Sequence, residues 1–179
     1  MLKIFVILIF VALSDAAFGQ TAWESYIQLP SPENAEAVER IEYSKGAIPE
    51  RDTYRFEHIL LLETQIAAGD AAAWRLAYRL RAKSDGALYE DINHALSRMI
   101  RPHPKIFLQE FQKLGIPSES LFDALLMTGE EYVDLYDAQK YELSMRLEAI
   151  ESVTDDALMG TRDLCVRILR GAIESIPEQ

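Results

Sequence analysis

Cysteine is almost absent from this sequence. Its single cysteine, Cys165, excludes a disulfide within the chain, so stability must come from a packed core. Cys165 lies between Leu164 and Val166, and we interpret it as a small buried apolar residue.

Familiar catalytic motifs are absent too. The sequence has no G-x-S-x-G, no Gly-rich phosphate-binding loop, no C-x-x-C and no H-E-x-x-H. These absences argue against the familiar hydrolases and nucleotide enzymes, but not against an unfamiliar enzyme. We therefore name no catalytic residue and expect no cofactor.

No apolar run reaches the roughly 20 residues that a membrane-spanning helix needs. The run Ile4–Leu13 follows Lys3 and leads to small residues that end at Gly19. This pattern is typical of a secretory signal peptide, and a retained anchor is the alternative. We predict that residues 1–19 are cleaved off after Gly19, with Ala17 as another possible end. The remaining protein would be exported, periplasmic or secreted, with no stable membrane insertion.

Positive charge is in short supply, with 18 basic against 29 acidic residues and a formal net charge of −11. Such a balance makes nucleic acid and anionic membranes poor partners. The charge is uneven, however. From Asp70 to Lys105 the sequence has seven basic and four acidic residues, which leaves −14 for the rest of the chain.

Helix periodicity and helix-ending residues dominate what is present. No run of any length has the two-residue period of a strand, although Glu130–Tyr136 would suit a short extended piece. We expect helices to begin near Pro32, Asp70, Asp85, Pro104, Ser118 and Thr154, where capping residues or prolines stand. The prediction is an all-α fold of antiparallel helical hairpins, with residues 20–179 as one domain and residues 20–30 as an N-terminal arm.

The pairing of these helices resembles a known architecture. Gly69-Asp70 opens one helix and Asp85-Gly86 opens its partner, and paired helices recur about every 33 to 37 residues. This spacing resembles HEAT-type or related α-α superhelical repeats, over about half of the chain. The resemblance implies a binding scaffold and no particular chemistry. A compact helical bundle is the alternative.

A basic stripe is the first candidate site. Arg75, Arg79 and Lys83 are spaced i, i+4 and i+8, so they share one helix face. Clustered guanidiniums favour carboxylate or phosphate, and neighbouring aromatic residues are common in recognition surfaces. The predicted site for a protein or an anion comprises Trp74, Arg75, Tyr78, Arg79, Lys83, Arg98 and Arg101. The alternative is that acids elsewhere in the chain, such as Glu33, Glu36 and Glu39, neutralise the stripe.

A second candidate is the pair Asp91 and His94, which one turn of helix would bring together. Carboxylate–histidine metal sites use such spacing, but they need further ligands that this segment lacks. The sequence therefore favours a scaffold or binding module for a protein or envelope component. A small metal-dependent enzyme that uses Asp91 and His94 is the alternative, and the oligomeric state is left open.

Overall fold

The computed structural model describes residues 22–40, 52–82, 84–115, 118–129, 132 and 134–178, without the side chains of residues 39, 52–57 and 118–121. The predicted signal peptide (residues 1–19) and Lys83 lie outside these residues. The described chain is all-α and contains no strand, which confirms the predicted fold class. Its elements are α1 (Ala22–Gln28), α2 (Pro32–Glu39), α3 (Asp52–Ala67), α4 (Ala71–Arg81), α5 (Gly86–Ser97), α6 (Pro104–Leu114), α7 (Ser118–Leu126), α8 (Tyr136–Glu151), the 3₁₀ turn η2 (Asp156–Leu158) and α9 (Met159–Ser175).

Helix starts follow the capping chemistry of the sequence. The Ser31 hydroxyl accepts a hydrogen bond from the Asn34 amide at 3.2 Å, with proline at the first helical position of α2. The Asp70 carboxylate accepts from the amides of Ala72 and Ala73 at 2.8 and 3.2 Å, and so caps α4. These side chains satisfy amides that have no partner within the helix.

One local prediction was wrong, because Thr154 does not cap the last helix. Asp155 accepts from the Ala157 amide at 3.1 Å instead and begins η2, which continues directly into α9. The predicted N-terminal arm contains the helix α1, which buries Trp23 and Tyr26.

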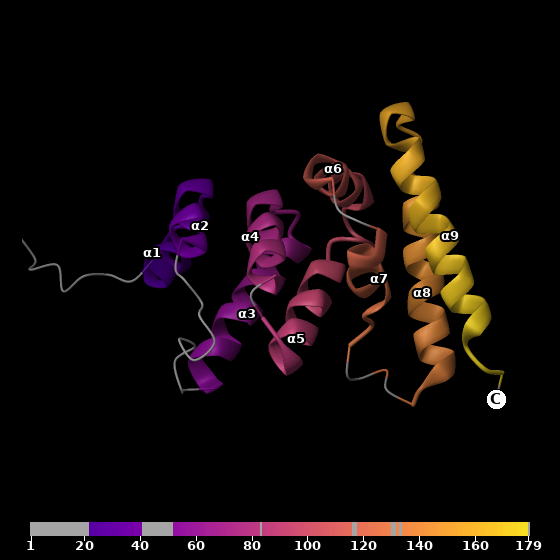
Figure 1. Cartoon of the computed structure of the whole chain (residues 1–179), viewed down its shortest axis with the longest axis horizontal. Helices are drawn as coiled ribbons and strands as arrows, with labels where there is room; N and C mark the ends of the chain where they lie inside the picture. Colours follow the sequence, from indigo (N-terminus) through magenta and orange to yellow (C-terminus); the bar gives the residue numbers. More distant parts are fainter. Residues whose placement is uncertain are drawn as a thin grey trace, which may run out of the picture.

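The helices follow one another in chain order along the long axis of the molecule, from α1 and α2 at one end to α8 and α9 at the other (Figure 1). Some consecutive helices pack together, such as α1 with α2, α4 with α5, and α8 with α9. Others pack on the next helix but one, such as α2 on α4 and α3 on α5. In the described chain, no helix is long and apolar enough to cross a membrane.

The core is centred on α4, which contacts α2, α3, α5 and α6. Trp74 is fully buried there, and its indole Nε1 donates to the carbonyl of Leu96 at 3.2 Å. The rings of Phe107 and Phe111 of α6 meet the indole edge-on, each with centroids 5.9 Å away. At the other end of the molecule Cys165 is fully buried, as predicted, and burial raises the pKa of its thiol to about 12. A thiol with so high a pKa is a poor nucleophile at neutral pH.

A buried arginine joins three helices beside this core. Arg81 of α4 is only 7% exposed, and its Nε donates to the Asn93 side chain on α5 at 2.5 Å. Its Nη2 donates to Asp123 of α7 at 2.9 Å and to the Tyr89 hydroxyl. The Tyr89 hydroxyl in turn donates to Asp123. These contacts of Arg81 and Tyr89 with Asp123 tie α7 to the hairpin of α4 and α5.

Candidate binding groove

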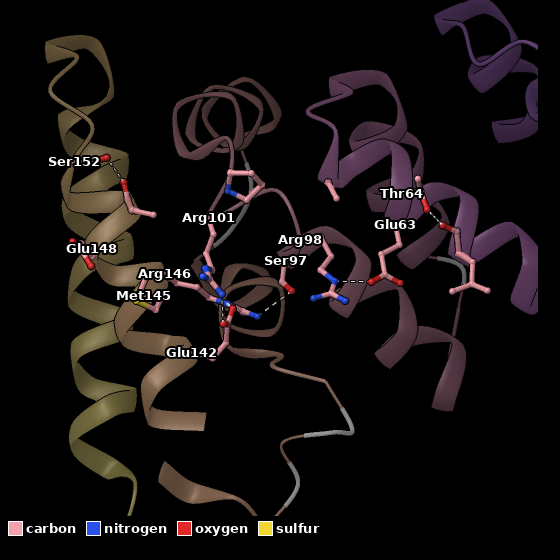
Figure 2. A pocket seen from close by; sticks show the side chains of 14 residues that line it. Glu63, Thr64, Ser97, Arg98, Arg101, Glu142, Met145, Arg146, Glu148 and Ser152 are labelled. Atoms are coloured by element: carbon pink, nitrogen blue, oxygen red, sulfur yellow. Dashed lines mark hydrogen bonds and ion pairs between the residues drawn. The ribbon is translucent and has the colours of Figure 1, made fainter. Parts of the chain in front are cut away.

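A groove of about 970 Å³ runs between α3, the end of α5, and α8. The wall formed by α3 is one face of that helix, with residues spaced i, i+3, i+4 and i+7. Figure 2 shows α3 on one side, α8 on the other and the segment that ends α5 between them. The lining residues are Leu60, Glu63, Thr64 and Ala67 on α3, Ser97, Arg98, Arg101 and Pro102 at the end of α5, and Glu142, Met145, Arg146, Glu148, Ala149 and Ser152 on and after α8.

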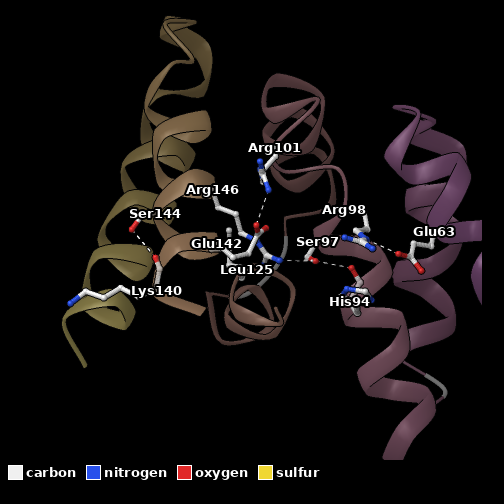
Figure 3. Close-up of polar contacts among 10 residues, drawn as sticks. All are labelled: Glu63, His94, Ser97, Arg98, Arg101, Leu125, Lys140, Glu142, Ser144 and Arg146. Carbon is white, nitrogen blue, oxygen red and sulfur yellow. Dashed lines mark hydrogen bonds and ion pairs between the residues drawn. The ribbon is translucent and has the colours of Figure 1, made fainter. Parts of the chain in front are cut away.

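Arg146 fixes the floor of the groove. Its side chain is 3% exposed and its three nitrogens all donate: Nε to Glu142 at 3.0 Å, Nη1 to the Leu125 carbonyl at 2.7 Å and Nη2 to the Ser97 hydroxyl at 3.3 Å. The Ser97 hydroxyl donates onward to the His94 carbonyl at 2.7 Å. These contacts join α5, α7 and α8 (Figure 3). The buried guanidinium is therefore held in one orientation by partners on three helices.

Two further arginines stand at the surface of the groove. Arg98 Nε donates to Glu63 Oε1 at 2.5 Å, and Arg101 Nη1 donates to Glu142 Oε2 at 2.8 Å. The two arginine side chains are each 46% exposed, whereas those of Glu63 and Glu142 are 19% and 11% exposed. A molecule that enters the groove would thus meet the guanidiniums before it meets their carboxylates.

The charges at this point do not balance. Glu142 receives hydrogen bonds from both Arg101 and Arg146, so two cations share one carboxylate. Burial, above all, lowers the pKa of Arg146. Glu142 opposes this shift, and the like charge of Arg98 adds to it. The local excess of positive charge is therefore at Glu142, between the guanidiniums of Arg101 and Arg146. A third acid of the groove, the exposed Glu148, lies away from these arginines in Figure 2.

The structure divides the predicted basic and aromatic site. Arg98 and Arg101 line the groove, but the aromatic residues belong to the core. Trp74 is fully buried and stacks on the half-buried Tyr78 with ring centroids 5.8 Å apart. The expectation that Trp74 contributes to a recognition surface is therefore wrong, because α4 is surrounded by four helices and buries a wider face than its apolar spacing suggests.

The basic residues of α4 lie apart from the groove. Arg75 Nη1 donates to Glu110 of α6 at 2.6 Å, and Lys113 donates to the other oxygen of the same buried carboxylate at 2.8 Å. Burial raises the pKa of Glu110, but the combined effect of Lys113 and Arg75 is larger and lowers it below its usual value. Arg79 is exposed, and Lys83 lies outside the described residues.

Part of the basic stripe is thus neutralised within the chain, as the alternative interpretation held, although by other acids than expected. Of the acids named for it, Glu36 pairs instead with Arg40 on its own helix, at 3.7 Å between two exposed side chains. The side chain of Glu39 lies outside the described residues.

Asp91 and His94 both lie on α5, half-buried. The Nε2 atom of His94 is buried and has no hydrogen-bond partner within the described chain. However, no group of three histidine, cysteine or acidic side chains that could hold a metal occurs in the described chain. The geometry gives the metal-dependent alternative no support.

Sequence reasoning missed Glu63, Glu142 and Arg146. Glu142 and Arg146 are spaced i, i+4, a pattern that predicts an ion pair on one helix face. Nothing in the local pattern shows that this pair is buried or that α5 supplies a second arginine to it. The chain as a whole matches no protein-family model, no curated protein and no solved structure.

Proposed function

We propose that this protein is an exported helical scaffold that binds a protein or another envelope component in the groove between α3, α5 and α8. One observation carries the proposal. The groove combines a preorganised polar floor with an apolar residue, Leu60, that is 50% exposed on its wall. Binding sites commonly combine an apolar surface with a few fixed polar groups.

The row of helical hairpins supports a scaffold function. Successive hairpins along one axis give an elongated molecule whose side surfaces are built from several helices (Figure 1). Stacked helical pairs of this type present extended binding surfaces, as in α-α superhelical repeats. Export is supported by the run Ile4–Leu13 after Lys3, which has the character of a secretory leader.

Site-specific crosslinking in the producing cells tests the proposal. One variant carries p-benzoylphenylalanine in place of Leu60, and a matched control carries it in place of Tyr141. Tyr141 is 65% exposed on α8 and does not line the groove. We expect illumination to yield a discrete adduct from position 60 and none from position 141. No adduct from position 60, or the same adduct from both positions, would contradict the groove as the binding site.

A further inference from the structure

The groove exposes two arginine side chains, each 46% exposed, although the whole chain carries −11. Its two most accessible charged side chains near the floor are Arg98 and Arg101, and their carboxylate partners are recessed behind them. Arg146 adds a third positive charge beneath them that is fixed by three helices. The accessible chemistry of this groove is therefore that of an anion receptor.

We infer that the occupant of the groove is an acidic segment of a partner protein, in which a carboxylate lies next to an apolar side chain. The carboxylate would meet Arg98 and Arg101, beside the point where Arg101 and Arg146 share the single carboxylate of Glu142. The apolar side chain would pack between Leu60 and Ala67 of α3 and Met145 of α8. This inference rests on the proposed function and adds the chemistry of the partner.

The carboxylate has a physical reason to prefer this place. Guanidinium groups bind carboxylates through two parallel hydrogen bonds, and Arg98 and Arg101 are three residues apart on consecutive turns. Their positions are set before any ligand arrives, because Glu63 and Glu142 already orient them. Such preorganisation lowers the entropy cost of binding. A lone phosphate or sulfate would use the arginines but would leave the apolar walls unfilled, which is why we assign a peptide.

The test is a selection of random short peptides displayed on phage against the purified mature protein. The best peptides are then synthesised with a fluorescent label and titrated by fluorescence polarisation. We expect the enriched peptides to carry Asp or Glu beside an aliphatic or aromatic residue. Enrichment of neutral or basic peptides, or of acidic peptides whose binding does not depend on the groove, would overturn the inference.

Three variants decide whether an enriched peptide uses the arginines. The double variant Arg98→Gln/Arg101→Gln should weaken binding at least about tenfold, since it removes two charge-assisted contacts. Arg167→Gln removes a positive charge from an exposed position on α9 that does not line the groove, and should leave affinity unchanged. Circular dichroism checks that each variant is folded.

The variant Glu63→Gln gives a result of opposite sign and does not disturb the buried floor. It frees Arg98 from its carboxylate and should tighten an acidic peptide about threefold, which is the scale of a partly exposed ion pair. A peptide that binds Glu63→Gln equally or more weakly refutes the inference, even if the double arginine variant fails to fold.

The crosslinking and peptide experiments fail separately. If position 60 crosslinks to a neutral or basic segment of a partner, the result supports the binding scaffold and refutes its specificity for acidic segments. If position 60 gives no adduct, the result refutes the proposed function, whatever peptides the purified protein selects.

Discussion

Acid should weaken this protein through one buried histidine, His58 of α3. Its side chain is 4% exposed and stacks on Trp23 of α1, with ring centroids 4.1 Å apart and planes 13° from parallel. Burial lowers the pKa of His58 from 6.5 to about 4, because the protonated ring would lose its hydration. The contact that docks α1 onto α3 therefore depends on a neutral imidazole.

The sign of the effect follows from proton uptake. Above about pH 6.5 the ring is neutral in the folded and the unfolded chain, so the full stability is present. As pH falls toward 4, His58 binds a proton in the unfolded chain but not in the folded one. The free energy of unfolding therefore declines. A difference of 2.5 pKa units at about 1.4 kcal/mol each limits the loss to about 3 kcal/mol, of which about 2.5 kcal/mol is lost at pH 4.5.

The replacement His58→Phe keeps a flat ring against Trp23 and removes the titrating group. Urea unfolding followed by circular dichroism at pH 7, 6, 5 and 4.5 gives the free energy of unfolding for both proteins. Carboxylates titrate in the same range, but they do so in both proteins and cancel in the difference. We expect the wild-type protein to lose about 2 to 3 kcal/mol more than His58→Phe between pH 7 and 4.5. Parallel curves would refute the assignment of a depressed pKa to His58.

Local undocking of α1 limits how much the free energy of unfolding can fall in acid. If detaching Trp23 and its helix costs less than keeping His58 neutral, α1 leaves before the rest of the fold opens. Hydrogen exchange of the α1 amides would then accelerate selectively below pH 6, and the variant His58→Phe would not show it.

Further predictions concern a turn and the buried ion pairs. Gly69 has φ of +90°, and a Cβ there would lie 3.0 Å from the His103 ring, so Gly69→Ala should lower the free energy of unfolding by at least about 2 kcal/mol. Gly115→Ala, at φ of +58° with open space around it, should cost only about 1 kcal/mol, and equal losses in thermal denaturation would contradict the steric argument. Arg146→Met should cost about 3 kcal/mol because it leaves buried acceptors behind. Combined with Glu142→Gln it should cost less than the sum of the two changes, and an additive double-mutant cycle would show that the pair is not coupled.

The helix starts could be predicted from sequence because their chemistry is local. Ser31 and Asp70 accept hydrogen bonds from amides within three residues, and Pro104 suits the first turn of α6 because its φ is fixed and it has no N–H to satisfy. The sequence pattern therefore holds all the relevant partners. The prediction that Thr154 caps the last helix was wrong for a related reason. Thr154 and Asp155 are adjacent possible caps, and only the path of the chain into η2 decides which side chain meets an amide.

The position of Trp74 could not be predicted, because it depends on how many helices surround α4. The spacing of Ala73, Leu76, Ala77 and Leu80 predicts one buried face, and the aromatic ring lies beside that face. A helix at the edge of a stack would expose the ring. Helix α4 is central and contacts four others, so the neighbouring face is buried too.

The groove depends on tertiary structure still more strongly. Leu60 of α3 and Met145 of α8 look like core residues in the sequence, since each belongs to an apolar stripe of helical period. In the structure Leu60 and Met145 line the groove, whereas Ile66 of α3 and Ile150 of α8 are buried in the core. A stripe of apolar residues thus predicts that a helix face packs against another surface. It does not show whether that surface belongs to the same chain.

The net charge of the chain is also a weaker guide to its partner than the sequence suggests. At physiological ionic strength, salt largely screens the interaction between exposed charges that are more than about 8 Å apart. Acidic residues far from the groove therefore act weakly on a ligand there, whereas Arg98, Arg101 and Arg146 line it. Glu63 and Glu142 orient Arg98 and Arg101 but do not cover them, since the arginine side chains are the more exposed partners in both pairs. An acidic protein can in this way select an acidic segment, because the position and exposure of a few charges decide recognition at contact distance.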